Sequence, residues 1–77
     1  MIINYAQFGL FTRRELIASG TISEMEKRAI EEVEKTPYKK FFISCIIFDN
    51  FDEPTEGEKV LSVSKINDDI IVINELL

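Results

Sequence analysis

The sequence contains no histidine, no tryptophan and a single cysteine among its 77 residues. Without histidine the chain lacks the side chain that most often acts as a general base near neutral pH, and one thiol alone cannot build an ordinary zinc site. No disulfide can form within the chain, which favours a reducing compartment. Cys45 itself lies in an apolar run between Ser44 and Ile46, where we expect a packed and unreactive thiol.

Other sequence signals of catalysis or of membrane insertion are also missing. The three glycines, Gly9, Gly20 and Gly57, are isolated, so no glycine-rich loop can cradle a phosphate. No apolar stretch approaches the roughly 20 residues that span a bilayer. The basic pair Arg13 and Arg14 follows the apolar start of the chain, whereas in a secretory leader it would precede it. We therefore expect a soluble, cytoplasmic protein that is not an enzyme and that binds no cofactor, no metal and no membrane.

Acidic residues outnumber basic residues by fourteen to nine, which gives a net charge of −5. The segment 49–58, DNFDEPTEGE, carries five carboxylates and no basic residue. Such a segment is either a solvated loop that keeps the chain soluble or a patch that faces a basic partner. The candidate partner-binding carboxylates are those of this segment and two from the helix expected at 23–35: Asp49, Asp52, Glu53, Glu56, Glu58, Glu31 and Glu34.

The start of the chain predicts a strand followed by a short helix. Residues 2–8 are rich in β-formers and predict a strand that ends at the following glycine. In residues 12–20, Thr12 and Glu15 have the spacing of a capping box, and Gly20 suits the end of a helix. We therefore expect a helix of about two turns. It must pack against the core, because a helix this short is not stable alone.

Residues 23–35 predict a longer helix with one apolar face. Its apolar side chains fall within an arc of roughly 140° at about 100° per residue. Ser23 and Glu26 form a capping box at its start, with Thr21 and Glu24 as the competing pair. A threonine followed by a proline then ends the helix.

The second half of the chain predicts three strands. Residues 41–48, FFISCIIF, are apolar on both faces and rich in β-branched and aromatic side chains, as in a strand that is covered on both sides. Residues 59–66 alternate between apolar and polar side chains, and NDD at 67–69 is a turn signal. The apolar residues that follow form a last strand, which pairs with 59–66 as a hairpin.

These elements assemble into one small α+β domain, residues 1–77, in the order β-α-α-β-β-β. We expect a mostly antiparallel four-stranded sheet, whose last three strands form a meander, with two short helices on one face. The helices leave the other face bare, and that face carries the second apolar row of strand 41–48. The candidate contact residues are Phe42, Ile46 and Phe48, or Phe41 and Ile47 if the register is opposite. Either the sheet curls on itself or another molecule covers this face.

Two helices joined at a glycine and followed by strands also resemble a winged helix-turn-helix, in which helix 23–35 would enter the DNA major groove. That helix carries five glutamates against three basic residues. Nucleic-acid binding draws much of its affinity from cations that displace counterions. Direct nucleic-acid binding is therefore disfavoured.

What remains is a small acidic module that binds another protein. In size and charge the chain resembles the small acidic inhibitors that phages make against host nucleases, polymerases and defence systems. This resemblance implies a partner in the host cell that handles nucleic acid and presents a basic surface to the acidic segment and the acidic helix face. The alternative is an oligomeric or antitoxin-like subunit, a homodimer included, that associates through the apolar sheet face.

Overall fold

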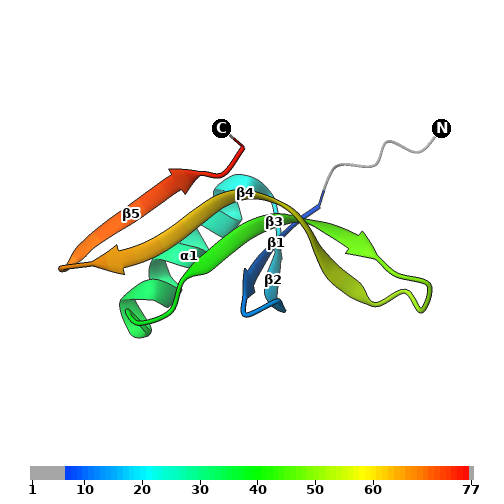
Figure 1. Cartoon of the computed structure of the whole chain (residues 1–77), viewed down its shortest axis with the longest axis horizontal. Helices are drawn as coiled ribbons and strands as arrows, with labels where there is room; N and C mark the ends of the chain where they lie inside the picture. Colours follow the sequence, from blue (N-terminus) through cyan, green and yellow to red (C-terminus); the bar gives the residue numbers. More distant parts are fainter. Residues whose placement is uncertain (1–6, 77) are drawn as a thin grey trace.

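A computed structural model describes residues 7–76, which form one antiparallel five-stranded sheet and one helix (Figure 1). The strands lie in the order β2-β1-β3-β4-β5, so β3 is central and β2 and β5 are the edges. The α+β class and the antiparallel sheet agree with the prediction, whereas the four-strand and two-helix details do not. The elements are β1 (Phe8–Thr12), β2 (Glu15–Gly20), α1 (Ile22–Lys35), β3 (Phe41–Phe48), β4 (Pro54–Ile66) and β5 (Asp69–Asn74).

The predicted helix at 12–20 is wrong, because this segment forms a β-hairpin turn and strand β2. Arg13 and Arg14 both have positive φ, 52° and 66°, which is the backbone of the two-residue turn that joins antiparallel strands. Thr12 and Glu15 face each other across that turn as strand partners, and do not form a capping box. A two-turn helix gains little without packing, whereas β2 gains a full ladder along β1. The two helices required by a helix-turn-helix are therefore not formed in residues 7–76.

The first predicted strand is displaced along the chain. Its residues 2–6 lie outside the described part, and β1 begins at Phe8 and continues through Gly9 to Thr12. The prediction that Gly9 ends the strand is therefore wrong. A glycine is needed inside β1 for a packing reason, because a Cβ there would lie 2.6 Å from the ring of Phe11 and 2.7 Å from Leu16.

The predicted helix 23–35 is confirmed as α1, which starts one residue earlier. Its cap is the competing pair: the Thr21 hydroxyl accepts from the Glu24 N–H at 3.1 Å, and the Glu24 carboxylate accepts from the Thr21 N–H at 2.9 Å. Met25, Ala29 and Val33 are buried. They face the sheet because their spacing puts them on one side of the helix.

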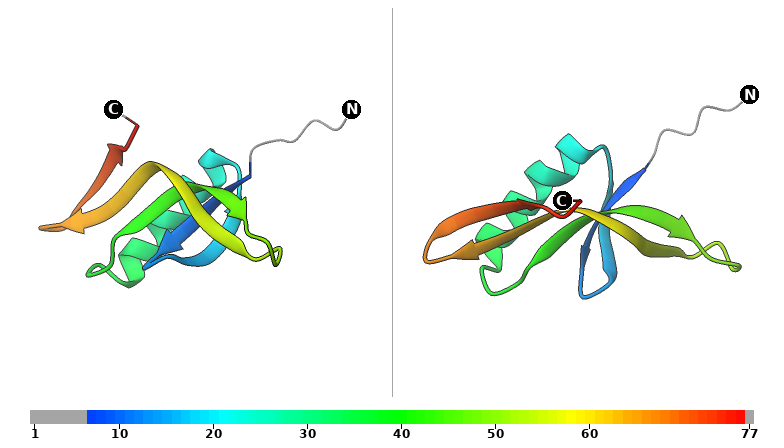
Figure 2. Two further views of the ribbon diagram at one scale, coloured as in Figure 1. Left: turned by 45° about the vertical axis from the view of Figure 1, so that its right-hand side comes forward. Right: turned by 45° about the horizontal axis from the view of Figure 1, so that its top comes forward.

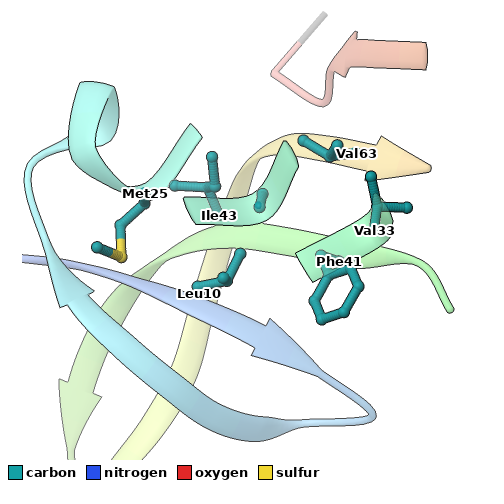
Figure 3. Packing of buried hydrophobic residues seen from close by; sticks show 7 residues of the cluster. Leu10, Met25, Val33, Phe41, Ile43 and Val63 are labelled. Carbon is teal, nitrogen blue, oxygen red and sulfur yellow. The ribbon is translucent and has the colours of Figure 1, made fainter. Parts of the chain in front are cut away.

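The main core lies between α1 and the sheet. Leu10 of β1, Phe41 and Ile43 of β3 and Val63 of β4 are at most 1% exposed and pack with Met25 and Val33 of α1 (Figure 3). Strand 41–48 was predicted to lie covered within the sheet, and it is confirmed as the central strand β3. Its C-terminal end differs, because Ile47 and Phe48 are more than half exposed.

On the face of the sheet opposite α1, the curl of the sheet covers part of the surface, over β1 and β4. Phe11, Phe42 and Ser62 form one row across β1, β3 and β4 on this face, and Phe11 and Ser62 are almost fully buried. Strand β2 contacts β4 although β1 and β3 separate them in the sheet order. The sheet therefore curls on itself around Phe11, while Ile73, which lies opposite Ser62 on the same face, is 45% exposed.

The C-terminal hairpin agrees with the prediction. Asn67 and Asp68, both with positive φ, form a two-residue turn between β4 and β5. Strand β4 is longer than predicted, because it begins at Pro54 and so includes half of the segment expected to be an acidic loop. Within residues 7–76, no helix has the length and apolar content to cross a membrane.

Candidate functional site

Strands β3 and β4 run on beyond the rest of the sheet as a projecting hairpin, residues 46–56, which we call the hairpin arm (Figures 1 and 2). Along the arm Ile46 pairs with Glu56, Ile47 with Thr55, and Phe48 with Pro54. The arm forms one end of a molecule whose longest dimension is 46 Å against 22 and 21 Å across. Residues 49–53 form the tip of the arm.

The arm exposes large apolar side chains among carboxylates. Phe51 is 85% exposed, Phe48 57% and Ile47 55%. Asp49, Asp52 and Glu53 of the tip are exposed as well. A cluster of apolar side chains rimmed by charge at the end of a projection is typical of a protein contact surface.

The tip is an ordered turn held by the Asp49 carboxylate. Its Oδ1 accepts from the Phe51 N–H at 2.8 Å and from the Glu53 N–H at 2.9 Å. The backbone adds two bonds: the Asp49 N–H donates to the Glu53 carbonyl at 3.1 Å, and the Asp52 N–H donates to the Asp49 carbonyl at 3.0 Å. Asp52 takes a positive φ of 60°, which aspartate tolerates better than most residues. The exposed ring of Phe51 is therefore presented on a fixed backbone.

The base of the arm is packed on one side. A Cβ on Gly57 would lie 2.7 Å from the side chain of Ile47 and 3.0 Å from the Cys45 carbonyl. Glycine thus lets the Ile47 side chain lie across β4. The Thr55 hydroxyl donates to the Ile47 carbonyl at 2.8 Å, which ties the two strands together next to the tip.

The five carboxylates predicted from segment 49–58 divide into two groups. Asp49, Asp52 and Glu53 lie at the tip, whereas Glu56 and Glu58 lie on β4. Glu56 points into the sheet, where it accepts from the buried Ser44 hydroxyl at 2.7 Å and lies 3.7 Å from Lys59 Nζ. Its side chain is only 8% exposed, so Glu56 holds β4 to β3. Glu58 remains exposed.

The two helix carboxylates lie far from the tip. Glu31 and Glu34 belong to the C-terminal half of α1, which lies at the opposite end of the long axis from the arm (Figure 1). Glu34 accepts from Lys65 Nζ at 2.9 Å and so joins α1 to β4. The structure therefore does not bring the acidic helix face and the acidic tip into one surface.

The three residues predicted for an apolar contact do not form one open face either. Phe42 lies under two ammonium groups, Lys40 Nζ at 5.2 Å and Lys59 Nζ at 4.9 Å from the ring centre. Ile46 is partly buried, with a side-chain atom 3.0 Å from where a Cβ of Gly9 would be. Only Phe48 is largely exposed, and it belongs to the arm.

Basic side chains that are scattered in the sequence gather beside the arm. An open cleft of about 430 Å³ is lined by Arg14, Pro54, Thr55, Glu56 and Lys59. The Thr12 hydroxyl donates to the Lys40 carbonyl at 3.1 Å, which holds the segment before β3 beside the β1–β2 turn. Sequence patterns missed this grouping because it depends on the β1–β2 hairpin. The sequence carries no turn signal for that hairpin, because the two turn positions, 13 and 14, are both arginine.

The described residues offer no metal centre, since no three histidine, cysteine, aspartate or glutamate side chains within 7–76 are grouped to hold an ion. Comparisons of the chain with protein-family models, curated protein sequences and solved structures gave no significant match. The geometry of the hairpin arm is therefore the basis for the functional proposal.

Proposed function

We propose that this protein is a small acidic protein-binding module that docks on a basic partner through the tip of the hairpin arm. The observation that carries the proposal is Phe51, which is 85% exposed on a turn ordered by its neighbour Asp49. No contact of the fold requires an aromatic side chain there. An exposed aromatic group on a fixed backbone loses little conformational entropy when it binds, which makes it a good anchor.

The negative charge of the tip indicates a partner with a basic surface. The tip carries Asp49, Asp52 and Glu53 around the apolar side chains, and the chain has a net charge of −5. Carboxylates at the rim of an interface steer a basic surface into place and disfavour acidic partners. Basic surfaces are typical of proteins that handle nucleic acid. Together with the small size of the chain, this supports an inhibitor of the phage type that blocks a nucleic-acid-handling host or defence protein.

The proposal is tested with variants that remove the charge of the tip without changing its shape. Asp52→Asn with Glu53→Gln keeps side-chain size, and asparagine suits the positive φ at position 52. Glu26→Gln with Glu31→Gln on α1 removes the same charge elsewhere and is the matched control. The partner is first captured from host extract on the immobilised protein and identified by mass spectrometry. It is then purified, and its affinity for each variant is measured by calorimetry.

The tip variant is expected to bind about tenfold more weakly than the helix control. Raising the salt concentration from about 50 to about 500 mM is expected to weaken wild-type binding by a similar factor, since exposed charges are screened. Equal affinities for the tip and helix variants, or an affinity that salt does not change, would remove the tip carboxylates from the interface.

The second candidate function is an oligomeric subunit, but the surface through which it would associate differs from the predicted one. On the predicted apolar sheet face, the ring of Phe42 lies under the ammonium groups of Lys40 and Lys59. The exposed apolar residues outside the arm that favour association belong to the other end of the molecule, where Val72 and Ile73 of β5 are 41% and 45% exposed.

A further inference from the structure

Strand β5 is an edge strand with an apolar sequence. It reads DIIVIN, with four β-branched aliphatic residues in a row, and Val72 and Ile73 are 41% and 45% exposed. Ile66 and Leu76, which flank β5, are 57% and 54% exposed. Edge strands of this kind pair readily with a further strand, because their outer backbone groups are free and their side chains gain by burial.

The usual protections of an edge are missing from β5. Residues 70–74 include no proline and no charged side chain, and the register between β4 and β5 runs without a bulge from Leu61–Asn74 to Ile66–Asp69. The opposite edge is different, because the register of β2 with β1 shifts between Leu10 and Phe11. The two edges therefore differ in their capacity to accept another strand.

The backbone groups that β5 leaves open follow from its hairpin. A two-residue turn closes on a hydrogen-bonded pair, here Ile66 and Asp69, and such pairs recur at every second residue along the ladder. The hydrogen bond from the Glu75 N–H to the Val60 carbonyl, 2.9 Å, agrees with this alternation of hydrogen-bonded and non-hydrogen-bonded pairs. Ile70, Val72 and Asn74 consequently direct their N–H and C=O groups outward, away from β4.

We propose that β5 pairs in antiparallel orientation with β5 of a second copy of this chain. The open groups of Ile70, Val72 and Asn74 are complementary to themselves under a two-fold axis, so the contact closes as a dimer. The stretch 70–74 is uncharged, so that two net-acidic chains can meet along it. Each copy buries aliphatic side chains that its own thin core leaves exposed.

Charge selects the register of this pairing. If Val72 lay opposite its own copy, Asp69 would lie opposite Glu75, and like charges directly across a sheet are destabilising. With Ile71 opposite its own copy, Ile70 pairs with Val72 and Asp69 lies opposite Ile73. The second register pairs the outward groups of Ile70 with those of Val72 twice, once on each side of the two-fold axis, places Asn74 opposite the turn residue Asp68, and opposes no two carboxylates. The pairing also leaves both arms free, because β5 and the arm lie at opposite ends of the molecule (Figure 1).

The proposal predicts a specific cross-link. In a Cys45→Ser background, Ile71→Cys places two thiols at a non-hydrogen-bonded pair with Cα atoms about 4.5 Å apart, within the range of a disulfide. Val72→Cys is the control, because each Val72 lies opposite Ile70 of the other copy and is too far from its own counterpart. Under mild oxidation Ile71→Cys is expected to give a covalent dimer and Val72→Cys to stay monomeric. A cross-link at position 72 but not at 71 would overturn the register.

Sedimentation velocity tests the pairing itself without cysteine. Wild type is expected to sediment as a dimer at micromolar concentration. Val72→Pro removes an outward N–H, which the monomer does not use, and is expected to give a folded monomer by circular dichroism. Ser19→Lys on the other edge is expected to remain dimeric. A monomeric wild type, or a Val72→Pro variant that dimerises like wild type, would overturn the proposal. If Val72→Pro does not fold, Ile73→Glu replaces it, because it places a carboxylate directly opposite Asp69 of the other copy and is expected to give a folded monomer.

Discussion

The Asp49 carboxylate accepts a hydrogen bond from the backbone N–H of Phe51 at 2.8 Å, and this contact links the charge of the tip to the position of its aromatic side chain. The same oxygen accepts from the Glu53 N–H at 2.9 Å. One carboxylate therefore contributes to the acidity of the surface and also fixes the backbone that presents Phe51. A partner that contacts both the tip carboxylates and the Phe51 ring therefore finds them in a fixed relative position.

Asp49→Ala and Asp49→Asn are expected to separate these two roles. The amide oxygen of asparagine can still accept both hydrogen bonds, whereas alanine cannot, so only Asp49→Ala should loosen the turn. The loss is expected to be about 1 kcal/mol of local stability. Amide hydrogen exchange at Phe51 and Glu53 measures it: faster exchange in Asp49→Ala and near wild-type exchange in Asp49→Asn are expected. Equal exchange in both variants would mean that Asp49 does not order the tip.

Phe41 and Phe51 are expected to respond oppositely to truncation. Phe41 is 1% exposed and Phe51 is 85% exposed. Phe41→Ala should destabilise the fold by about 3–5 kcal/mol because it opens a cavity between α1 and the sheet. Phe51→Ala should change stability by less than about 0.5 kcal/mol. Urea unfolding gives both values, and a large loss in Phe51→Ala would show that its ring serves the fold.

Ser44 and Glu56 form a nearly buried pair across β3 and β4, joined at 2.7 Å. Ser44→Ala is expected to cost about 1–3 kcal/mol, because it leaves the carboxylate of Glu56 with only the long contact to Lys59. Glu56→Gln keeps an oxygen that can accept from Ser44 and should cost less. The free energies of unfolding of the two single variants and the double variant form a cycle. A coupling energy near zero would contradict the pairing.

The cap of α1 predicts a pH dependence. Hydrogen bonds from the Thr21 backbone N–H, and secondarily its side chain, lower the pKa of the Glu24 carboxyl below its usual 4.5. A carboxyl whose pKa is lower in the folded state stabilises the fold above its unfolded pKa, and this contribution is lost as the pH falls through the folded value. Wild type should therefore exceed Glu24→Gln in urea midpoint at pH 7. The difference should shrink steadily below about pH 4.5; a constant difference would contradict the assignment.

The sequence predicts correctly the elements whose residue pattern fits only one type of secondary structure. The apolar stripe of Ile22–Lys35 forms a helix and the apolar run Phe41–Phe48 forms a central strand as expected, and the NDD signal marks a turn, made by its first two residues. The β1–β2 hairpin was missed because Thr12 and Glu15 have the spacing of a helix cap as well as the positions on either side of a two-residue turn. Arginine at both turn positions carries none of the usual turn signals.

The candidate site was predictable only in its composition. The number of carboxylates in segment 49–58 is readable from the sequence, but their directions depend on the bulged register between β3 and β4. That register turns Glu56 inward to Ser44. The exposure of Phe48 and Phe51 follows from how far the arm extends beyond the sheet, which no local pattern encodes.

The most direct test of the proposed function compares two exposed aromatic side chains. Tyr38 and Phe51 are 78% and 85% exposed, but Tyr38 belongs to the connection between α1 and β3, which lies at the other end of the molecule from the arm (Figure 1). The affinity of the captured partner is measured for wild type, Phe51→Ser and Tyr38→Ser. Phe51→Ser is expected to bind at least about tenfold more weakly, with Tyr38→Ser equal to wild type. Wild-type affinity in Phe51→Ser would contradict docking through the arm.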